Sequence, residues 1–435
     1  MLFKDITIIT EDFTTREHVD VVVQDDRIAS IADAGESSID STDASTGEVI
    51  DGRNFIMMPG FFNGHAHSPM TLMRGYGEGL NLQDWLFTRI FPFEDKLTSE
   101  AVYYGTKLAM AESLRFGIVS SSDMYYFLDD MIQAVIDSGA KINVSRAIAN
   151  PEGVPFSELE RIKEMIDVEK RLQGAADGRV IVDAALHAEY TSNEETARGL
   201  AELSKELGLI MHVHVSETLT EHEECKTRHE GRTPTKYLAD CGIFDIPAIA
   251  AHCVHVEPED IEILADKGVY VATNPVSNLK LASGICDVNA LLKKGVKVTL
   301  GTDGTSSNNN LSMFEEMKTM SILAKVKTGD PTTMAPNEAL KIATRNGALA
   351  QGRDDSGLIK EGFKADLVLL RKDTPNMWPA YDLVDNIVLA ATDADVYLTM
   401  VDGKVLYKDG EYTTIDVDDT IKGVERSIKD ILSRL

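Results

Sequence analysis

Hydrophobic residues along this chain follow one spacing near both ends and another in between. Near the N-terminus, β-branched residues alternate with polar residues and turn formers, as in residues 19–23 and 27–31. This period of two is typical of half-buried strands. A similar pattern returns in residues 365–370. Two strand-rich ends around a different centre predict one discontinuous domain, a small β-sandwich formed from residues 1–57 and 355–435.

The central part of the chain alternates short apolar runs with longer helical patterns. This order predicts a parallel sheet covered by helices, so we expect a fold of the α/β class. Eight strands within ~300 residues are typical of a (β/α)8 TIM barrel, which we assign to residues 58–354. The expected helices cover residues 99–116, 157–172, 194–207 and 258–267, and the expected strands begin at Met57, Gly117, Ile142, Val180, Leu209, Ala248, Val269 and Val296.

Polar residues gather where the expected strands end. His65 and His67 end the first strand, and because side chains of a strand alternate between faces, these two histidines project to the same side. The chemistry of a TIM barrel collects at the C-terminal ends of its strands, so residues there are candidates for an active site. The later strand ends supply His187, His212, His214, Glu217, His252 and Asp303.

Four of these residues form a candidate metal site. Imidazole and carboxylate groups both suit zinc, and a catalytic zinc keeps one position open for water. We therefore predict that His65, His67, His214 and Asp303 bind one divalent metal ion, with Zn²⁺ as the expected ion. His212 shares a strand face with His214 but lies deeper, so we interpret it as an interior histidine. The histidines without strand-end context are expected to be structural or solvent-facing, and they are His18, His222, His229 and His255.

Composition narrows the range of partners. The 435 residues carry a formal net charge of −28, which repels polyanions, so we expect a small molecule rather than nucleic acid. The four cysteines show no CxxC spacing, which argues against a thiolate zinc site and a disulfide framework. Apolar runs fall short of the ~20 residues of a membrane helix, and the first residues lack a signal-peptide pattern. We expect a cytoplasmic enzyme that does not bind membranes.

Six motifs, taken in order, resemble those of one family over nearly the whole chain. The chain resembles the amidohydrolase superfamily and, within it, the deaminases that act on 5′-methylthioadenosine and S-adenosylhomocysteine. The motifs are Pro-Gly-Phe-Phe-Asn-Gly-His-Ala-His at 59–67, Pro-Met-Thr-Leu-Met-Arg-Gly-Tyr at 69–76, His-Val-Ser-Glu-Thr at 214–218, Ala-His-Cys-Val-His at 251–255, Asn-Pro-Val-Ser-Asn-Leu-Lys-Leu at 274–281 and Leu-Gly-Thr-Asp-Gly at 300–304.

The resemblance implies a zinc enzyme that removes the exocyclic amine of an aminopurine by hydrolysis. The bridging lysine of dinuclear relatives is replaced near the end of strand four by His187, which favours one metal ion. Asp303 would accept a proton from water as the general base, and Glu217 would protonate a ring nitrogen and then the departing ammonia. His252 would orient the attacking water. The alternative for Glu217 is a carboxylate that satisfies free N–H groups at a helix start.

The resemblance also implies which residues contact the substrate. In the loop at residues 79–94, Trp85 matches a tryptophan that packs on the nucleoside, and Glu94 matches a glutamate that bonds the ribose hydroxyls. Arg146 matches an arginine near the 5′ side of the substrate. His187 matches a histidine that contacts the purine. The expected substrates are therefore 5′-methylthioadenosine, S-adenosylhomocysteine, 5′-deoxyadenosine or adenosine.

Two departures from the family pattern concern the substrate. Glu189 stands where relatives carry proline, in Ala188-Glu189-Tyr190, and it would either bond a different substrate group or cap the following helix. A second pocket arginine has no matching motif, although Arg161 lies in the right region. Both departures shift the expectation away from a carboxylate-bearing substrate and toward a smaller 5′-modified adenosine.

Two alternative functions remain open at this point. Related barrels displace another group, such as an amine on guanine or a halide on a triazine-like ring, and pocket shape decides among them. The presence of Trp85 and Glu94 favours a nucleoside. A protein of another class would be a non-catalytic barrel that binds metal, but such a site has no need of Glu217 and His252. The family resemblance suggests a homo-oligomer, for which the sequence itself offers no signal.

Overall fold

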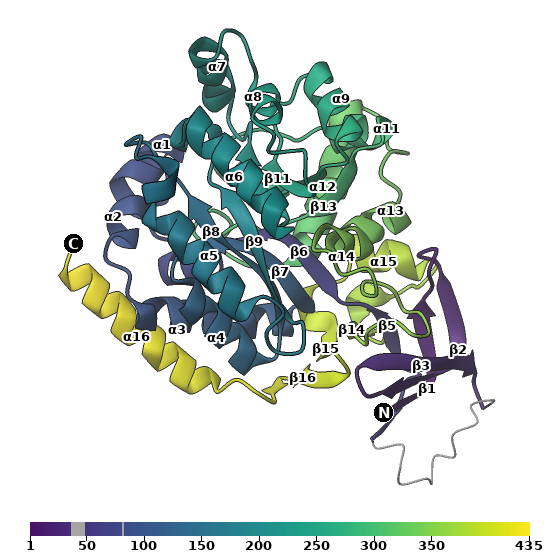
Figure 1. Cartoon of the computed structure of the whole chain (residues 1–435). Coiled ribbons are helices and arrows are strands. Elements are labelled where there is room, and N and C mark those ends of the chain that lie inside the picture. Colours follow the sequence, from purple (N-terminus) through teal and green to yellow (C-terminus); the bar gives the residue numbers. More distant parts are fainter. Residues whose placement is uncertain (36–47, 81) are drawn as a thin grey trace.

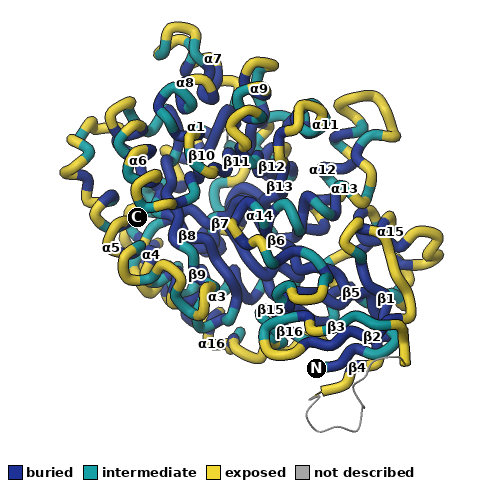
Figure 2. The backbone as a smooth tube through the Cα atoms, turned by 45° about the vertical axis from the view of Figure 1, so that its right-hand side comes forward, coloured by how far each residue is buried: buried dark blue, intermediate teal, exposed yellow. Residues whose placement is uncertain are grey.

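The protein was analysed as a computed structural model that describes residues 1–35, 48–80 and 82–435. Residues 36–47 of the expected N-terminal β-domain and Asn81 of the expected pocket loop lie outside the described residues. The described chain forms two sheets, a barrel covered by helices and a second sheet that extends beside it at the lower right (Figure 1). Figure 2 shows the strands as the buried centre of the molecule, with the exposed residues mostly on helices and connecting segments.

The larger unit is a parallel barrel, as predicted. Its eight strands follow one another in sequence order from β6 to β13, and a parallel bridge between Ala66 and Asp303 brings the last strand beside the first. The backbone N–H of Asp303 donates to the carbonyl oxygen of His65 at 2.9 Å. The strands are β6 (Phe61–Ala66), β7 (Ile118–Tyr125), β8 (Lys141–Ile148), β9 (Val180–Leu186), β10 (Met211–Val215), β11 (Ala248–His252), β12 (Tyr270–Thr273) and β13 (Lys297–Leu300).

Helices cover the barrel, and their starts follow from local sequence. The side chains of Thr98, Asn193 and Thr218 accept hydrogen bonds from backbone N–H groups at the starts of α3, α6 and α7, as N-cap residues do. The helices are α1 (Leu82–Trp85), α2 (Phe91–Glu94), α3 (Ser99–Arg115), α4 (Leu128–Ser138), α5 (Glu160–Leu172), α6 (Glu194–Leu207), α7 (Leu219–Arg228), α8 (Pro234–Asp240), α9 (Pro258–Asp266), α10 (Pro275–Lys280), α11 (Val288–Lys293), α12 (Met313–Thr328), α13 (Pro336–Lys341), α14 (Gly347–Ala350), α15 (Leu383–Leu389) and α16 (Val417–Ser433).

Both chain ends build the second, mixed sheet, as the repeated strand pattern predicted. Strand β14 from the C-terminal part pairs antiparallel with β5 from the N-terminal part, so the two ends share one sheet. The predicted domain boundaries at 57/58 and 354/355 stay a prediction. The strands are β1 (Leu2–Ile9), β2 (Thr15–Gln24), β3 (Arg27–Asp33), β4 (Val49–Asp51), β5 (Phe55–Pro59), β14 (Leu367–Arg371), β15 (Val396–Val401), β16 (Lys404–Lys408) and β17 (Glu411–Tyr412).

The start of the first barrel strand differs from the prediction. Met57, the expected start, lies in β5 of the mixed sheet, and the barrel strand β6 begins only at Phe61. Both strands are buried along their whole length, and the apolar run from Phe55 to Phe62 passes from β5 into β6 without a polar break. Gly60 separates them and lies so close to Val119 that an added Cβ would come within 2.4 Å of its Cγ1. A continuous apolar run therefore concealed two strands of different sheets.

The C-terminal helix is an element that the sequence analysis did not include. Helix α16 lies along α3 at the edge of the barrel (Figure 1), and its Gly423 approaches the ring of Tyr104 closely. Its apolar residues recur three or four positions apart, as in an amphipathic helix, so the signal was present in the sequence. Across residues 1–35, 48–80 and 82–435, every helix is too short or too polar to cross a membrane.

Candidate metal centre and substrate pocket

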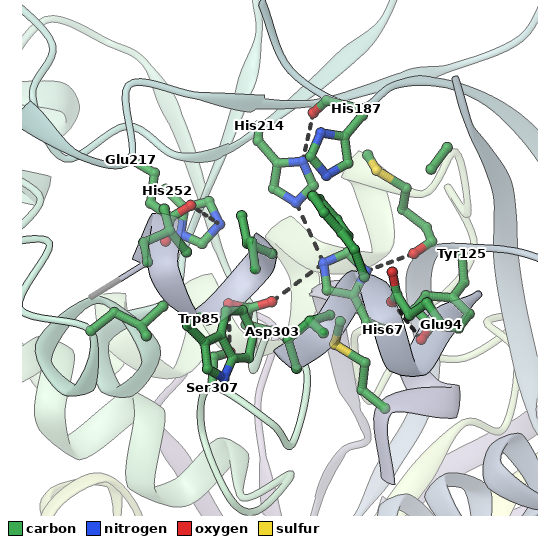
Figure 3. A pocket seen from close by; sticks show the side chains of 18 of the residues that line it. His67, Trp85, Glu94, Tyr125, His187, His214, Glu217, His252, Asp303 and Ser307 are labelled. Carbon is green, nitrogen blue, oxygen red and sulfur yellow. Dashed lines mark hydrogen bonds and ion pairs between the residues drawn. The ribbon is translucent and has the colours of Figure 1, made fainter. Parts of the chain in front are cut away.

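Four of the strand-end residues meet in one cluster, although they come from three distant parts of the chain. His65 belongs to β6 and His67 directly follows it, His214 belongs to β10, and Asp303 follows β13. The Nε2 atoms of His67 and His214 are 3.4 Å apart, and Oδ1 of Asp303 lies 3.5 Å from Nε2 of His65 and 3.4 Å from Nε2 of His67. Figure 3 shows His67, His214 and Asp303 turned toward one another.

The hydrogen bonds behind these histidines determine what their inner nitrogens can do. Nδ1 of His67 donates to the carbonyl oxygen of Met124 at 2.6 Å, and Nδ1 of His214 donates to that of His187 at 2.6 Å. A carbonyl oxygen only accepts, so in the neutral imidazoles each proton sits on Nδ1 and each Nε2 presents a lone pair. Two lone pairs 3.4 Å apart cannot hydrogen-bond to each other.

The third histidine fits the same arrangement. Burial lowers the pKa of His65 to about 3, and burial also lowers the pKa of His214, so both imidazoles are neutral near pH 7. Nε2 of His65 is buried and has no hydrogen-bond partner among the described residues. Nδ1 of His65 is 2.9 Å from Nε2 of His212, which places His212 behind the cluster, as expected for an interior histidine. Converging lone pairs beside a carboxylate form a donor set that fits a divalent cation.

Glu217 and His252 lie beside this cluster, with Nε2 of His252 3.8 Å from Oε2 of Glu217. Burial raises the pKa of Glu217. The alternative role of Glu217 at the helix start is filled by another residue, because Glu221 accepts from the backbone N–H of Ser216 and of Glu217, and Thr218 caps α7. The carboxylate of Glu217 is therefore available to the cavity that it lines.

Further polar side chains hold the carboxylate of Asp303 and the imidazole of His252 in place. Oδ2 of Asp303 accepts from Ser277 at 2.6 Å and from Ser307 at 2.9 Å, and Nδ1 of His252 lies 2.8 Å from Oδ1 of Asn278. Ser277 and Asn278 belong to the Asn-Pro-Val-Ser-Asn motif, to which the sequence analysis assigned no role. Such outer contacts fix the orientation of ligating groups.

The cluster opens into an inner cavity at the C-terminal end of the barrel. His67, His214 and Asp303 line it, together with Glu217 and His252. The cavity is also lined by three residues expected to contact substrate, namely Trp85, Glu94 and His187. Figure 3 shows Glu217 and His252 on one side of His214, and Glu94 on the other.

Arg146 lies in a neighbouring, outer cavity and is not among the residues that line the inner one. Arg161, which had no motif, lines the same outer cavity. The two cavities share four wall residues, Phe91, Glu94, Tyr126 and Tyr190. Nε of Arg146 donates to Glu164 at 2.6 Å, and its guanidinium lies 4.7 Å from the centre of the Tyr126 ring. The inner and outer cavities therefore meet at Glu94.

Glu189 does not match either of its two expected roles. It is buried, and its carboxylate binds Arg228 at 2.6 Å and Nε2 of His229 at 2.6 Å. It is absent from the residues that line the two cavities, and helix α6 is capped by Asn193 instead. The interpretation as a substrate contact or a helix cap was therefore wrong, because the partners of Glu189 come from α7, about 40 residues away in the sequence.

Two aromatic residues of the site were missed. Tyr125 and Tyr126 follow one another at the end of β7 and line the inner cavity, and the hydroxyl of Tyr125 donates to Oε1 of Glu94 at 2.7 Å. The signal existed, since the end of every barrel strand is a candidate position. The sequence-based prediction named only histidine, glutamate and aspartate as catalytic or metal-binding candidates at these strand ends.

Comparison with known proteins agrees with this fold and this cluster. The amidohydrolase family matches residues 56–406, and the chain therefore belongs to the amidohydrolase family. It is 39% identical over 434 residues to a 5-methylthioadenosine/S-adenosylhomocysteine deaminase of Dictyoglomus thermophilum, covering 100% of this chain and 99% of that one.

Two solved structures share the whole architecture. An adenosine deaminase from Xanthomonas campestris with bound zinc superposes with a TM-score of 0.91 at 28% identity, covering 99% of this chain and 98% of that one. The atrazine chlorohydrolase of Arthrobacter aurescens, complexed with zinc, superposes with a TM-score of 0.87 at 22% identity, covering 98% and 99%. The second likeness is one of fold alone.

Proposed function

We propose that the protein is a zinc-dependent hydrolytic deaminase of an adenine nucleoside, which releases ammonia and the corresponding inosine analogue. The expected substrates are 5′-methylthioadenosine, S-adenosylhomocysteine, 5′-deoxyadenosine or adenosine. The observation that carries the proposal is a metal-competent cluster and a buried carboxylate in one cavity, which meets a second cavity at Glu94. The name and the near-complete coverage of the Dictyoglomus relative support the same reaction.

In this proposal the metal ion is one Zn²⁺, held by His65, His67, His214 and Asp303. The zinc in the Xanthomonas structure supports this choice, and so do the hydrogen bonds from Nδ1 of His67 and His214 to carbonyl oxygens, which leave the Nε2 atoms facing the cluster. A zinc ion bound there would lower the pKa of water toward about 7, so that hydroxide forms at neutral pH.

The chain's own residues then move protons. Asp303 accepts a proton from water, with its second oxygen held by Ser277 and Ser307. Glu217, whose pKa burial raises, acts as a general acid and gives a proton to a ring nitrogen of the purine. It then takes up the proton that Asp303 received and passes it to the departing ammonia. The second proton of the attacking water returns to Glu217 as the carbonyl forms and the C–N bond breaks, so both carboxyl groups end in their starting states. His252, oriented by Asn278, stabilises the negative charge that develops on the attacked carbon's oxygen.

The two cavities divide the substrate between them in this proposal. The purine lies in the inner cavity beside His187, and Trp85 supplies an apolar wall. Glu94, at the junction, accepts hydrogen bonds from the ribose hydroxyls. The 5′ substituent extends into the outer cavity, where Arg146 and Arg161 offer positive charge. A carboxylate-bearing substituent thus regains support, since both arginines line one cavity.

A metal analysis and an ammonia-release assay test the proposal together. We expect about one zinc per chain and ammonia from at least one of adenosine, 5′-deoxyadenosine, 5′-methylthioadenosine and S-adenosylhomocysteine. Guanine and triazines belong in the same assay, because related barrels act on such rings. Ammonia from guanine alone would replace the proposal with the alternative, and zinc without any turnover would favour the non-catalytic metal-binding barrel.

Three finer expectations accompany this proposal. A location in the cytoplasm, a homo-oligomer and the absence of nucleic-acid binding stay predictions. The net charge of −28 supports the last of these, because it repels polyanions. Light scattering of the purified protein would measure its oligomeric state.

A further inference from the structure

The carboxylate of Glu94 stands on a segment that the barrel sheet does not hold. Residues Leu82–Glu94 consist of α1, a five-residue π-helical turn from Leu86 to Ile90, and the four-residue α2. The dihedrals stay helical across both junctions, and Phe93 is buried in the core, so packing holds the backbone of this segment. The Glu94 side chain still needs a contact from the barrel if its carboxylate is to meet the ribose at a fixed distance from the metal centre.

Tyr125 supplies such an anchor. It is the last residue of β7, its side chain is buried, and its hydroxyl donates to Oε1 of Glu94 at 2.7 Å. Figure 3 shows the two side chains next to each other on the wall of the cavity. Burial raises the pKa of Tyr125 well above its usual value, so the phenol keeps its proton and acts as the donor. The hydroxyl of Tyr126 also interacts with this carboxyl group, and Tyr125 is the partner that belongs to β7 itself.

The same strand end also holds the metal cluster. The carbonyl oxygen of Met124, the residue before Tyr125, accepts from Nδ1 of His67 at 2.6 Å. Two consecutive residues of one buried strand therefore fix a candidate metal ligand and the candidate sugar-binding carboxylate. Because neighbouring residues of a strand are separated by a fixed backbone distance, β7 sets the spacing between the metal centre and Glu94.

We propose that Tyr125 is a positioning residue that selects for a ribose with free 2′- and 3′-hydroxyls, by holding the carboxylate of Glu94 at a set distance from the metal centre. This inference rests on the proposed function. Tyr125 does not touch the reacting atoms, so its loss should weaken substrate binding and leave the chemical step nearly unchanged. A hydrogen bond to a charged group is worth roughly a tenfold change in affinity or more.

The test compares Tyr125→Phe with the wild type on adenosine and on 2′,3′-dideoxyadenosine. For adenosine we expect KM to rise about tenfold while kcat stays within about twofold. For the dideoxy substrate, which lacks the hydroxyls, we expect both constants to stay within about twofold. Tyr412→Phe is the matched control. It removes a hydroxyl of the mixed sheet that donates to the carbonyl oxygen of Ala111 at 2.9 Å, and it should change neither KM nor kcat for either substrate.

A second variant makes the result independent of how well Tyr125→Phe folds. Glu94→Gln keeps the side-chain shape but removes the charge, and it should lower the preference for adenosine over the dideoxy substrate in the same way. In the double variant, Tyr125→Phe should change the preference for adenosine over the dideoxy substrate by less than about twofold beyond the effect of Glu94→Gln, since both substitutions act through one hydrogen bond.

Each other outcome overturns the inference. An equal loss on both substrates would mean that Tyr125 supports the fold or the chemical step, and an unchanged sugar preference would mean that it does not position Glu94. If the wild-type protein deaminates no nucleoside at all, the proposed function fails and this role fails with it. A failure of the proposed function is distinguishable from a failure of this inference alone, because only the former leaves the wild-type protein inactive on nucleosides.

Discussion

The two ends of the barrel bury polar groups in opposite ways. At the C-terminal end, Nε2 atoms of His67 and His214 face each other at 3.4 Å with no proton to share. At the N-terminal end, Lys141 lies between two carboxylates, 2.5 Å from Asp366 and 2.8 Å from Asp402. Burying a charge is tolerated when an opposite charge accompanies it, so the charge of Lys141 is balanced within the chain.

This difference separates binding from support. At the N-terminal end, the guanidinium of the buried Arg353 donates to the carbonyl oxygens of Gly178, Ile142 and Arg179. These hydrogen bonds connect the segment after the barrel to β8 and to the residues just before β9. The C-terminal end of the barrel places hydrogen-bond acceptors beside one another, and this arrangement does not stabilise the fold until a cation binds. We therefore expect substitutions at the C-terminal end of the barrel to change activity or metal affinity. Substitutions at its N-terminal end should change the free energy of unfolding.

The largest expected effect is on catalysis. Glu217→Gln should reduce kcat about 10³-fold, because an amide cannot transfer protons in general acid–base catalysis. Zinc content, measured by metal analysis, should stay the same. Glu189→Gln is the matched control, since it alters another buried carboxylate near the same rim that is paired with Arg228. It should lower stability while leaving kcat nearly unchanged, and a wild-type rate for Glu217→Gln would exclude the proton-transfer role.

At the opposite end, Lys141→Met should lower the free energy of unfolding by about 3–5 kcal/mol, because the buried Asp366 loses its ion-pair partner, whereas Asp402 keeps Lys364 at 3.4 Å. Denaturant unfolding measures this, and zinc content of the folded fraction should be unchanged. Lys236→Met is the control, because it breaks an exposed pair with Asp240 on helix α8 and should cost less than about 1 kcal/mol. Loss of zinc from the folded Lys141→Met protein would show that the N-terminal end of the barrel also supports metal binding.

A third change tests the metal cluster through stability. In the wild type, free zinc at 100 times its Kd should stabilise the fold by about 2.7 kcal/mol. His214→Ala should abolish most of this gain, while the metal-free variant should unfold much as the metal-free wild type does. Thermal melting with and without zinc measures both. A large loss of stability in the metal-free variant would show that His214 also supports the fold.

The smallest expected effect is one of pH. Burial raises the pKa of Glu94 to about 7, although the hydroxyls of Tyr125 and Tyr126 oppose the rise. Above pH 7 the charged carboxylate accepts ribose hydroxyls, and below it the protonated form accepts them more weakly. The ratio of kcat/KM for adenosine to that for 2′,3′-dideoxyadenosine should therefore fall several-fold between pH 8 and pH 6. In Glu94→Gln the ratio should not depend on pH.

Sequence reasoning succeeded where the argument depended on neighbouring residues. The alternation of a strand places His65 and His67 on one face whatever surrounds them, and helix α6 runs from Glu194 to Leu207 as its periodicity predicted. The (β/α)8 barrel is confirmed, because short strands separated by helices can close in few ways. These predictions needed only the local pattern and the order of elements.

The failures arose where a partner in space decided the outcome. Glu189 binds Arg228 and His229 of a later helix, and no local pattern reveals that pairing. Met57 lies in the mixed sheet because β14, from the other end of the chain, pairs with β5. Tyr125 was missed for the same reason, since its role depends on the position of Glu94.

The sequence by itself determined the barrel, the share of both chain ends in a second sheet, and the residue types available at the strand ends. Only the tertiary structure decided which of these residues meet. It brought β6, β10 and β13 to one cluster and separated Arg146 from the inner cavity. It also joined Tyr125 to Glu94. Periodicity is fixed by the geometry of single elements, whereas distances between side chains depend on how all elements pack together.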